Sequence, residues 1–477
     1  MIAFNGEIYN FQSLRAKIKP EQYTFRSKTD TEVILALYKI HGEACFEMLN
    51  GMFALAIWDT LEKTLVLARD RLGKKPLYFY QAQGDIAFAS ELKSLLTLEH
   101  VPRDIRLDAV YDFFAYQYVP DPKSIFENIF KLEPGAYLKI GPQGTKKAFY
   151  WQLSFSDVSD DEPAHRTEKL RALVEDCTTR RMLSDVPLGA FLSGGVDSSG
   201  IVAFMAKNSE TPVTTCSIGF ADKAYNEVEF ARSVAEQYET HHHEFTVDNN
   251  FVDELSHIVS FFDEPFADPS LVPTFFVSKL ARQKVTVALA GDGGDELFAG
   301  YEKYSADNRE NTLRQLFPAF LRESLFPPLA RFLKQTPIKL CQRAGSLLNS
   351  LALAPDRAFY QSNAHITDDE WNTLAKDSVK ETLQDYHPAT LTCERYHECD
   401  GQDHIAKILY TDIKTFLPGG ILVKVDRMSM ANSLEVRAPL LDYEVAEFAA
   451  KTSSDLKFKR GEKKHILKAM FLSLIHI

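Results

Sequence analysis

The sequence predicts two domains, an α+β domain followed by an α/β domain built on a parallel sheet. Three observations support this prediction. The chain has 477 residues, which is too long for a single hydrophobic core. Residues 1–150 contain apolar runs of strand length and few helical patterns, whereas strands and helices alternate in the early part of residues 165–477. Residues 154–164 are rich in Ser, Asp and Glu and form the expected linker.

In the first domain, two apolar runs of strand length flank a short polar segment. Residues 52–58 and 64–68 are the expected strands, and the polar segment between them favours a hairpin. Residues 31–41 have helical spacing, with Asp30 in position to cap the helix. Near the start of the chain, residues 5–7 (Asn-Gly-Glu) are typical of a tight polar turn.

The second domain begins with strands and helices that alternate, as they do in the βαβ units of a parallel sheet. The expected strands are residues 188–192, 213–218, 244–247 and 285–290. The expected helices are residues 198–206, 227–237 and 270–281. From about residue 308 the chain is expected to be helix and loop, with a break at Pro327-Pro328.

Composition excludes several classes of protein. Lys plus Arg total 54 and Asp plus Glu total 66, and the net charge of −12 argues against a nucleic-acid partner. The six cysteines form no C-x-x-C pair, which makes a zinc ribbon unlikely, and residues 241–243 (His-His-His) alternate faces on a strand, so they cannot easily share one metal ion. No signal peptide or membrane-length apolar run is found, so we expect a cytoplasmic protein with no membrane partner.

A glycine-rich string, SGGVDSS, lies between an expected strand and an expected helix. It consists of Ser193, Gly194, Gly195, Val196, Asp197, Ser198 and Ser199. The glycines let the backbone approach a ligand, and the serines stand at a helix start, which favours an anion. The Asp197 carboxylate suits Mg²⁺ that bridges to phosphate. An ordinary glycine-rich turn is the alternative. The Walker A lysine is missing, and the string resembles the PP-loop of ATP pyrophosphatases.

A second string, LAGDGGDE at residues 289–296, also follows an apolar strand. Because ligands bind at the carboxyl ends of parallel strands, we expect both loops to face one crevice. Asp292 and Asp295 have no basic neighbour in the sequence, and together with the first loop they predict a site for ATP and Mg²⁺. The alternative is a solvated turn of the kind that Asp-Gly favours.

Taken together, the strings of the chain resemble the class B, glutamine-hydrolysing asparagine synthetase family, up to about Met470. The resemblance rests on FNGEIYN, KTDTEV, GMFALAIWD, ARDRLGKKPLYF, SGGVDSS, DEPFADPS, AGDGGDELFAGY, KVDRMSMANSLEVRAPLLD and KKHILK, in that order. It implies an αββα N-terminal-nucleophile glutamine amidotransferase domain in residues 1–150 and a PP-loop synthetase domain in residues 165–477. In such enzymes ATP activates aspartate as β-aspartyl-AMP, and ammonia from glutamine travels internally to form asparagine. The implied partners are small substrates, with a homodimer possible.

The resemblance also implies roles for particular residues. Asn5 and Gly6 would form the glutaminase oxyanion hole, while Glu7 and Asp30 would hold the α-amino group of glutamine. The loop from Ser193 to Ser199 would bind pyrophosphate.

In the nucleotide site, Leu192 and Ile218 would contact adenosine through their backbones, and Ala290 and Gly291 would line the pocket. Asp197 and Asp295 would hold Mg²⁺.

Asp292 stands where the family often has Glu and would act in adenylation and in ammonia attack. Lys464 would stabilise the charge of adenylation, although a solvated helix lysine is the alternative. Arg437 and Asp442 would either organise the aspartate pocket or form a structural ion pair.

The sequence departs from the family pattern at both ends. The family nucleophile is a cysteine at the mature N-terminus, whereas residue 2 is Ile and the first cysteine, Cys45, is expected in the core. We therefore expect a chain truncated at both ends, unable to hydrolyse glutamine and at most ammonia-dependent. The alternatives are an amidotransferase for another carboxylate (a peptide, sugar acid or antibiotic precursor), an RNA-modifying PP-loop enzyme and a non-catalytic homologue.

Overall fold

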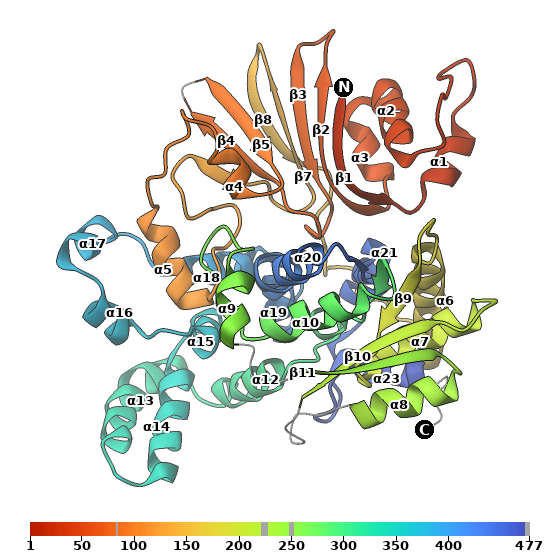
Figure 1. Ribbon diagram of the computed structural model, residues 1–477. Coiled ribbons are helices and arrows are strands. Elements are labelled where there is room, and N and C mark those ends of the chain that lie inside the picture. The colour runs from red at the N-terminus through yellow and green to blue at the C-terminus, as the bar shows by residue number, and fades with distance from the viewer. Residues whose placement is uncertain (83, 221–227, 248–251, 473–477) are drawn as a thin grey trace.

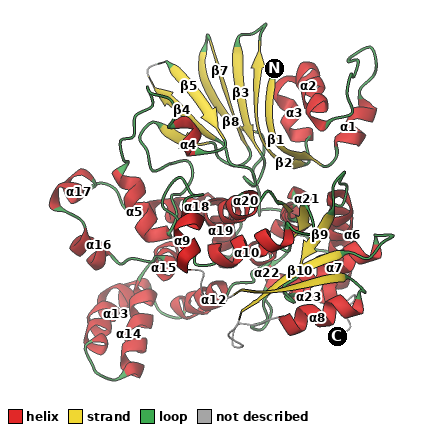
Figure 2. Cartoon of the chain, in the orientation of Figure 1, coloured by secondary structure: helices red, strands yellow, loops and turns green. Residues whose placement is uncertain are grey.

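The computed structural model describes residues 1–82, 84–220, 228–247 and 252–472 (Figure 1). Its N-terminal part contains two β-sheets with helices outside them, and its C-terminal part contains a further sheet surrounded by helices (Figure 2). Among the described residues, no helix is both long enough and apolar enough to cross a membrane.

Two antiparallel sheets form the centre of the N-terminal part. The first has the strand order β1-β2-β3-β7-β8 and the second β5-β4-β6. Their bounds are Ile2–Ile8 (β1), Gly51–Asp59 (β2), Thr64–Arg69 (β3), Tyr78–Ala82 (β4), Asp85–Ala89 (β5), Ile129–Lys131 (β6), Ala136–Gly141 (β7) and Gly144–Phe149 (β8). Apolar side chains of both sheets, including Ala54, Leu67, Phe79 and Leu138, meet in one core. The predicted hairpin is confirmed as β2 and β3.

Helices cover the outer faces of these sheets. They are Phe11–Lys17 (α1), Asp30–His41 (α2), Cys45–Met48 (α3) and Leu92–Leu95 (α4). A further helix, Leu107–Tyr116 (α5), packs instead against residues of the C-terminal part. Ile34 and Phe46 pack with Leu55 against the first sheet, and Leu92 packs with Tyr80 against the second. The predicted αββα layering is therefore confirmed.

Two local predictions in this part are wrong. Residues 5–7 form no turn, because they lie within β1, where Gly6 pairs with Phe53. Thr29, not Asp30, caps α2, since the Thr29 hydroxyl accepts a hydrogen bond from the Glu32 amide at 3.3 Å. Asp30 instead accepts a hydrogen bond from the Ile8 amide at 3.2 Å, so its carboxylate ties the helix to β1.

The C-terminal part is organised around a five-stranded parallel sheet, as predicted, with the order β11-β10-β9-β12-β13. The strands are Leu188–Phe191 (β9), Thr214–Phe220 (β10), His241–Val247 (β11), Val287–Leu289 (β12) and Glu435–Arg437 (β13). The helices around it begin with Pro163–Arg181 (α6), Val196–Lys207 (α7), Val228–Gln237 (α8), Val252–Val259 (α9) and Leu271–Ala281 (α10). The first residue of the predicted helix 227–237 lies outside the described residues.

The rest of the chain is helical. The helices are Gly294–Leu297 (α11), Glu302–Gln315 (α12), Ala319–Lys334 (α13), Lys339–Ala352 (α14), Pro355–Asn363 (α15), Asp368–Leu374 (α16), Asp377–Thr382 (α17), Ala389–Glu398 (α18), His404–Lys414 (α19), Val423–Met430 (α20), Tyr443–Ala450 (α21), Ser454–Lys457 (α22) and His465–Leu472 (α23). A π-helical segment, Leu417–Leu422, connects α19 to α20.

The break predicted at Pro327-Pro328 is wrong, because both prolines lie inside α13. Each proline removes one backbone hydrogen bond, and close packing against α14 offsets that loss. Gly345 of α14 permits this packing, since a β-carbon there would lie 2.8 Å from the Ala330 carbonyl oxygen. The α13–α14 hairpin extends away from the sheets (Figure 1).

The last helix is held against α7. A β-carbon at Gly200 would lie 1.9 Å from the ring of Phe471, so α23 can approach α7 only because residue 200 is glycine. The segment just before α23 carries Lys464, and this packing brings it to the start of α7.

Candidate active site

The two glycine-rich loops meet at the carboxyl ends of the neighbouring strands β9 and β12. A β-carbon at Gly291 would lie 2.7 Å from the Ser198 amide nitrogen, and one at Gly294 would lie 2.3 Å from Asp197 Oδ2. The structure thus brings both loops into direct contact, at the edge where a parallel sheet binds ligands.

The first loop has a shape that only glycine permits. Gly194 has φ +81°, and a β-carbon there would lie 2.6 Å from the Phe230 β-carbon on α8. The Ser193 and Ser198 hydroxyls lie 2.9 Å apart and share a hydrogen bond, and the Ser193 amide donates to Ser198 Oγ at 3.2 Å. The loop is therefore ordered in advance, with the amino end of α7 directed at any bound anion.

Lys464 joins the two loops by charge. Its ammonium lies 2.5 Å from Asp197 Oδ2 and 2.8 Å from Asp295 Oδ1. Burial lowers the pKa of Lys464, but Asp197 and Asp295 outweigh burial and raise it, so the side chain stays charged. Lys464 is 267 residues from Asp197 in the sequence, and only tertiary packing joins them.

The two carboxylates that contact Lys464, those of Asp197 and Asp295, carry more negative charge than its single ammonium balances. Burial raises the pKa of Asp197, and neighbouring Asp295 and Asp292 add to the rise. Burial also raises the pKa of Asp292, although Lys424 opposes this change. Asp197 Oδ1 is buried without a hydrogen-bond partner among the described residues, as is Ser199 Oγ. Hard carboxylate and hydroxyl oxygens are ligands that Mg²⁺ prefers, so these residues fit a magnesium ion.

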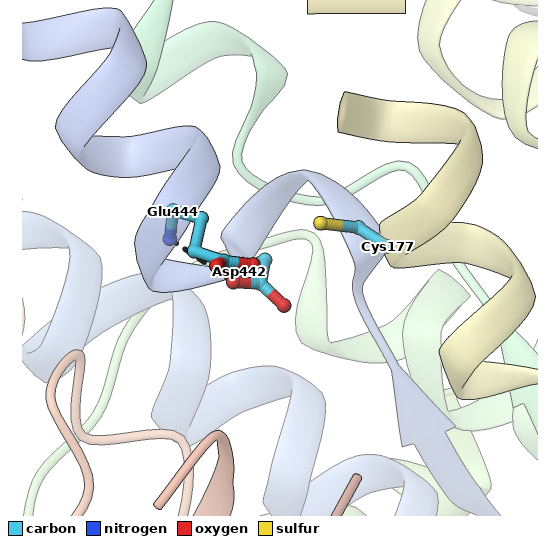
Figure 3. A group of neighbouring side chains, drawn as sticks. All are labelled: Cys177, Asp442 and Glu444. Carbon is cyan, nitrogen blue, oxygen red and sulfur yellow. Dashed lines mark hydrogen bonds between the residues drawn. The ribbon is translucent and has the colours of Figure 1, made fainter. Parts of the chain in front are cut away.

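A second cluster with acidic side chains is unsuited to bind a metal ion. Cys177, Asp442 and Glu444 lie close together at α6 and the start of α21 (Figure 3). Arg181 already pairs with Asp442 at 2.7 Å, and Arg180 pairs with Glu444 at 2.5 Å. Burial raises the pKa of the Cys177 thiol well above its usual value, so it remains protonated. Two arginines therefore neutralise this group and leave no need for a cation.

The remaining residues assigned to the nucleotide lie along the same edge of the sheet. Leu192 follows β9 and donates its amide hydrogen to the Cys216 carbonyl at 2.9 Å, while Ile218 lies on β10. Ala290 follows β12, and its amide donates to the Arg437 carbonyl at 2.9 Å.

The residues assigned to glutamine lie in the N-terminal part, on β1 and α2. A β-carbon at Gly6 would lie 2.0 Å from the Met52 carbonyl oxygen, so β1 approaches β2 there only with glycine. Asn5 Nδ2 lies 3.4 Å from Ser90 Oγ. Burial and the nearby Glu435 raise the pKa of Glu7 to about 7, although Arg437, 3.8 Å away, lowers it. The residues assigned to glutamine are thus separate from the residues assigned to the nucleotide, and Arg437 lies between the two sets.

Arg437 and Asp442 have different partners, so the alternative of an ion pair between them is wrong. Arg437 pairs with Glu435 at 2.6 Å, because both side chains belong to the short strand β13. Asp442 pairs instead with Arg181, and it accepts hydrogen bonds from Asn50 Nδ2 at 3.1 and 3.2 Å. Asp442 therefore links the two parts of the chain.

Sequence reasoning missed a cavity at the boundary between the two parts. Met52, Lys74 and Lys75 line it on one side, with Asp292 and Leu422 on the other. It also missed Lys424, whose ammonium lies 3.1 Å from Asp268 Oδ2 and 2.7 Å from Ser270 Oγ. Asp268 lies in the string DEPFADPS and Lys424 in the string KVDRMSMANSLEVRAPLLD, but nothing in either string indicates that the two residues are in contact.

Comparisons with known proteins agree with this geometry. The family model described as asparagine synthase matches residues 169–476, and the glutamine amidotransferase domain model matches residues 1–151. A Bacillus subtilis (strain 168) protein named asparagine synthetase [glutamine-hydrolyzing] 1 is 36% identical over 476 residues, which are 98% of this chain and 72% of that protein.

More distant relatives match over a similar extent. Asparagine synthetase [glutamine-hydrolyzing] 3 of the same organism is 28% identical over 98% of this chain and 72% of its own length. A Gibberella zeae protein named Amidase chry2 is 26% identical over 97% of this chain and 73% of its own length.

Proposed function

Because the chain belongs to the asparagine synthase family, we propose that it converts aspartate to asparagine with ATP and ammonia, releasing AMP and pyrophosphate. One observation carries the proposal. Lys464 lies 2.5 Å from Asp197 and 2.8 Å from Asp295, beside a loop shaped to hold phosphate. A lysine between two carboxylates, at the amino end of a helix, suits a reaction in which a polyphosphate departs.

The proposal divides the chain into a glutamine domain at residues 1–150 and a synthetase domain at residues 165–477. In the first, the Asn5 side chain and the Gly6 amide would donate to a developing oxyanion. Glu7 and Asp30 would bind the α-ammonium group of glutamine. Ammonia formed there would have to cross the boundary between the two parts, where a small cavity of about 30 Å³ reaches Asp292.

In the synthetase domain, the loop from Ser193 to Ser199 would bind the β- and γ-phosphates through its amides and hydroxyls. Leu192 and Ile218 would contact adenosine through their backbones, with Ala290 and Gly291 against the nucleotide. A Mg²⁺ ion held by Asp197 and Asp295 would neutralise phosphate charge.

The reaction would then proceed in two displacements. A side-chain carboxylate oxygen of aspartate attacks the α-phosphorus of ATP, and pyrophosphate leaves while Lys464 stabilises its charge. Ammonia next attacks the acyl carbon of β-aspartyl-AMP, AMP leaves, and the attacking nitrogen gives up a proton. Asp292 is the proposed acceptor of that proton, because burial raises the pKa of its carboxyl group and its side chain lines the cavity between the two parts.

The test measures pyrophosphate release by the purified chain with ATP, Mg²⁺, ammonia and aspartate, and identifies the amide by mass. Ammonia is the chosen nitrogen source because it bypasses the glutamine site. We expect aspartate to stimulate pyrophosphate release and Asp197→Asn to abolish it. Absence of stimulation by aspartate would refute the asparagine assignment, and absence of stimulation by every carboxylate tested would refute the class of reaction.

A second candidate is amidation of a larger carboxylate by the same chemistry. The aromatic pocket described below favours it. A non-catalytic role is disfavoured, because burial raises the pKa of Asp197 and of Asp292, so that these carboxylates are held at an electrostatic cost.

A further inference from the structure

An aromatic pocket of about 430 Å³ lies between the two parts of the chain, apart from the residues assigned to the nucleotide. Tyr116, at the end of α5, and Tyr118 belong to the N-terminal part. Tyr301, Tyr360 and Phe416 come from the C-terminal part, before α12, on α15 and after α19. Its volume is typical of small-molecule sites and is far more than free aspartate requires.

The five rings form a continuous wall. In the order Tyr360, Tyr116, Tyr118, Phe416, Tyr301, consecutive ring centroids are 6.0, 5.9, 6.4 and 6.0 Å apart. These are separations at which aromatic rings attract one another, so the wall is held by its own contacts. The Tyr116 hydroxyl also donates to the Pro388 carbonyl at 2.7 Å, which holds that ring in place.

The charged groups of the pocket are already paired. Lys303 lies 2.6 Å from Asp412. Asp268, which lines the pocket, pairs at 3.1 Å with Lys424, which does not line it.

The other two ionisable side chains that line the pocket, Glu302 and His365, provide no unpaired positive charge. Glu302 pairs with Lys463. Burial and the charge of Lys303 lower the pKa of His365, so this imidazole is neutral at pH 7. Among the described lining residues no unpaired cation remains for a second carboxylate, and the pocket suits an uncharged aromatic or apolar group.

Two residues that line the pocket also contact neighbours of the proposed reacting groups. Tyr301 follows the second loop and donates its hydroxyl hydrogen to Glu296 Oε1 at 2.6 Å, next to Asp295 in the chain. On another side, Asp268 pairs with Lys424, the cation that lowers the pKa of Asp292. Tyr301 and Asp268 thus link the pocket to the residues of the proposed synthetase site.

We propose that this pocket binds an aromatic or apolar portion of an acceptor, so that the chain also amidates an aspartyl carboxylate carried by a molecule larger than free aspartate. The inference rests on the proposed function, since it takes the amidation of an aspartyl carboxylate as given. The reacting carboxylate lies toward Asp292 and Lys424, and the aromatic portion lies against Phe416 and Tyr118.

The test compares L-aspartyl-L-phenylalanine with L-aspartyl-glycine and free aspartate as acceptors in the pyrophosphate assay. Burial of a phenyl group should lower KM for the first dipeptide roughly tenfold or more relative to the second, with little change in kcat. Phe416→Ala should reduce this ratio. Phe458→Ala is the matched control, because Phe458 packs half-buried against the same core but does not line the pocket.

Calorimetry with Mg²⁺ and α,β-methylene-ATP, which cannot release pyrophosphate, measures the dissociation constants of both dipeptides without turnover. Equal constants for the two dipeptides, with aspartate active, would overturn the inference and leave the proposed function standing. Failure of every carboxylate to release pyrophosphate would overturn the proposed function. The calorimetric ratio would still decide whether the pocket binds the phenyl group.

Discussion

Replacing Lys464 with methionine separates the role of its charge from that of its bulk. Methionine keeps a long flexible side chain but removes the ammonium that contacts Asp197 and Asp295. The matched control is Lys463→Met, because Lys463 is the preceding residue and pairs with Glu302, a side chain that is 83% exposed.

The size of the effect follows from the contacts. Lys464 is only 14% exposed and makes two charged contacts, so in the proposed reaction water would screen its charge little from the departing phosphates. Loss of one charge-stabilising donor typically lowers kcat by about 10²–10³-fold, which is roughly 2.7–4 kcal/mol of transition-state stabilisation. Lys463→Met removes only an exposed pair, for which about 0–1 kcal/mol is typical.

The Lys464→Met substitution should also change how thermal stability depends on Mg²⁺ and on pH. With Mg²⁺ at the proposed site, Lys464 would compete with the ion for the Asp197 and Asp295 oxygens, so Lys464→Met should increase the rise in Tm that Mg²⁺ produces. The pKa of Asp197 is already raised, and loss of Lys464 raises it further. A carboxyl group with a raised folded pKa stabilises the fold below its unfolded pKa and loses that effect as pH rises, so the variant should regain stability as pH falls toward 5.

The assays are pyrophosphate release with ATP and aspartate, and thermal melting with and without Mg²⁺ between pH 5 and 8. Equal kcat values for Lys464→Met and Lys463→Met would refute the catalytic reasoning. An unchanged response of Tm to Mg²⁺ would refute the idea that Lys464 and the metal share Asp197 and Asp295.

Three further predictions concern stability. Gly194→Ala, at φ +81° and against α8, should lower Tm by several degrees, whereas Gly42→Ala, at φ +57° with no described atom within 4 Å, should lower it less. Because the pKa of Glu7 is raised to about 7, wild-type Tm should fall between pH 5 and 8 more steeply than that of Glu7→Gln; parallel pH profiles would contradict this. Arg181→Met should cost about 3–5 kcal/mol in urea unfolding, since it leaves buried Asp442 without its closest cation, and Asp442→Leu added to it should recover part of the loss.

Local patterns in the sequence predicted most of the sheet of the C-terminal part. The apolar runs that became β9, β10, β11 and β12 could be identified because each combines strand length with a turn signal at its end. The strand β13 was missed, since three residues carry no periodicity and pair with β12 across about 145 residues of chain. The Pro327-Pro328 break failed for a related reason, because packing against α14 outweighed local preference.

The sequence by itself determined the two glycine-rich loops and their acidic residues, because backbone freedom at Gly194 and the order strand–loop–helix are local properties. Only the tertiary structure decided which groups meet there. It placed Lys464 against Asp197, paired Asp442 with Arg181 instead of Arg437, and closed an aromatic pocket from rings of both parts of the chain. Such contacts depend on how distant helices and strands pack, and packing is set by the whole core, which no short stretch of sequence encodes.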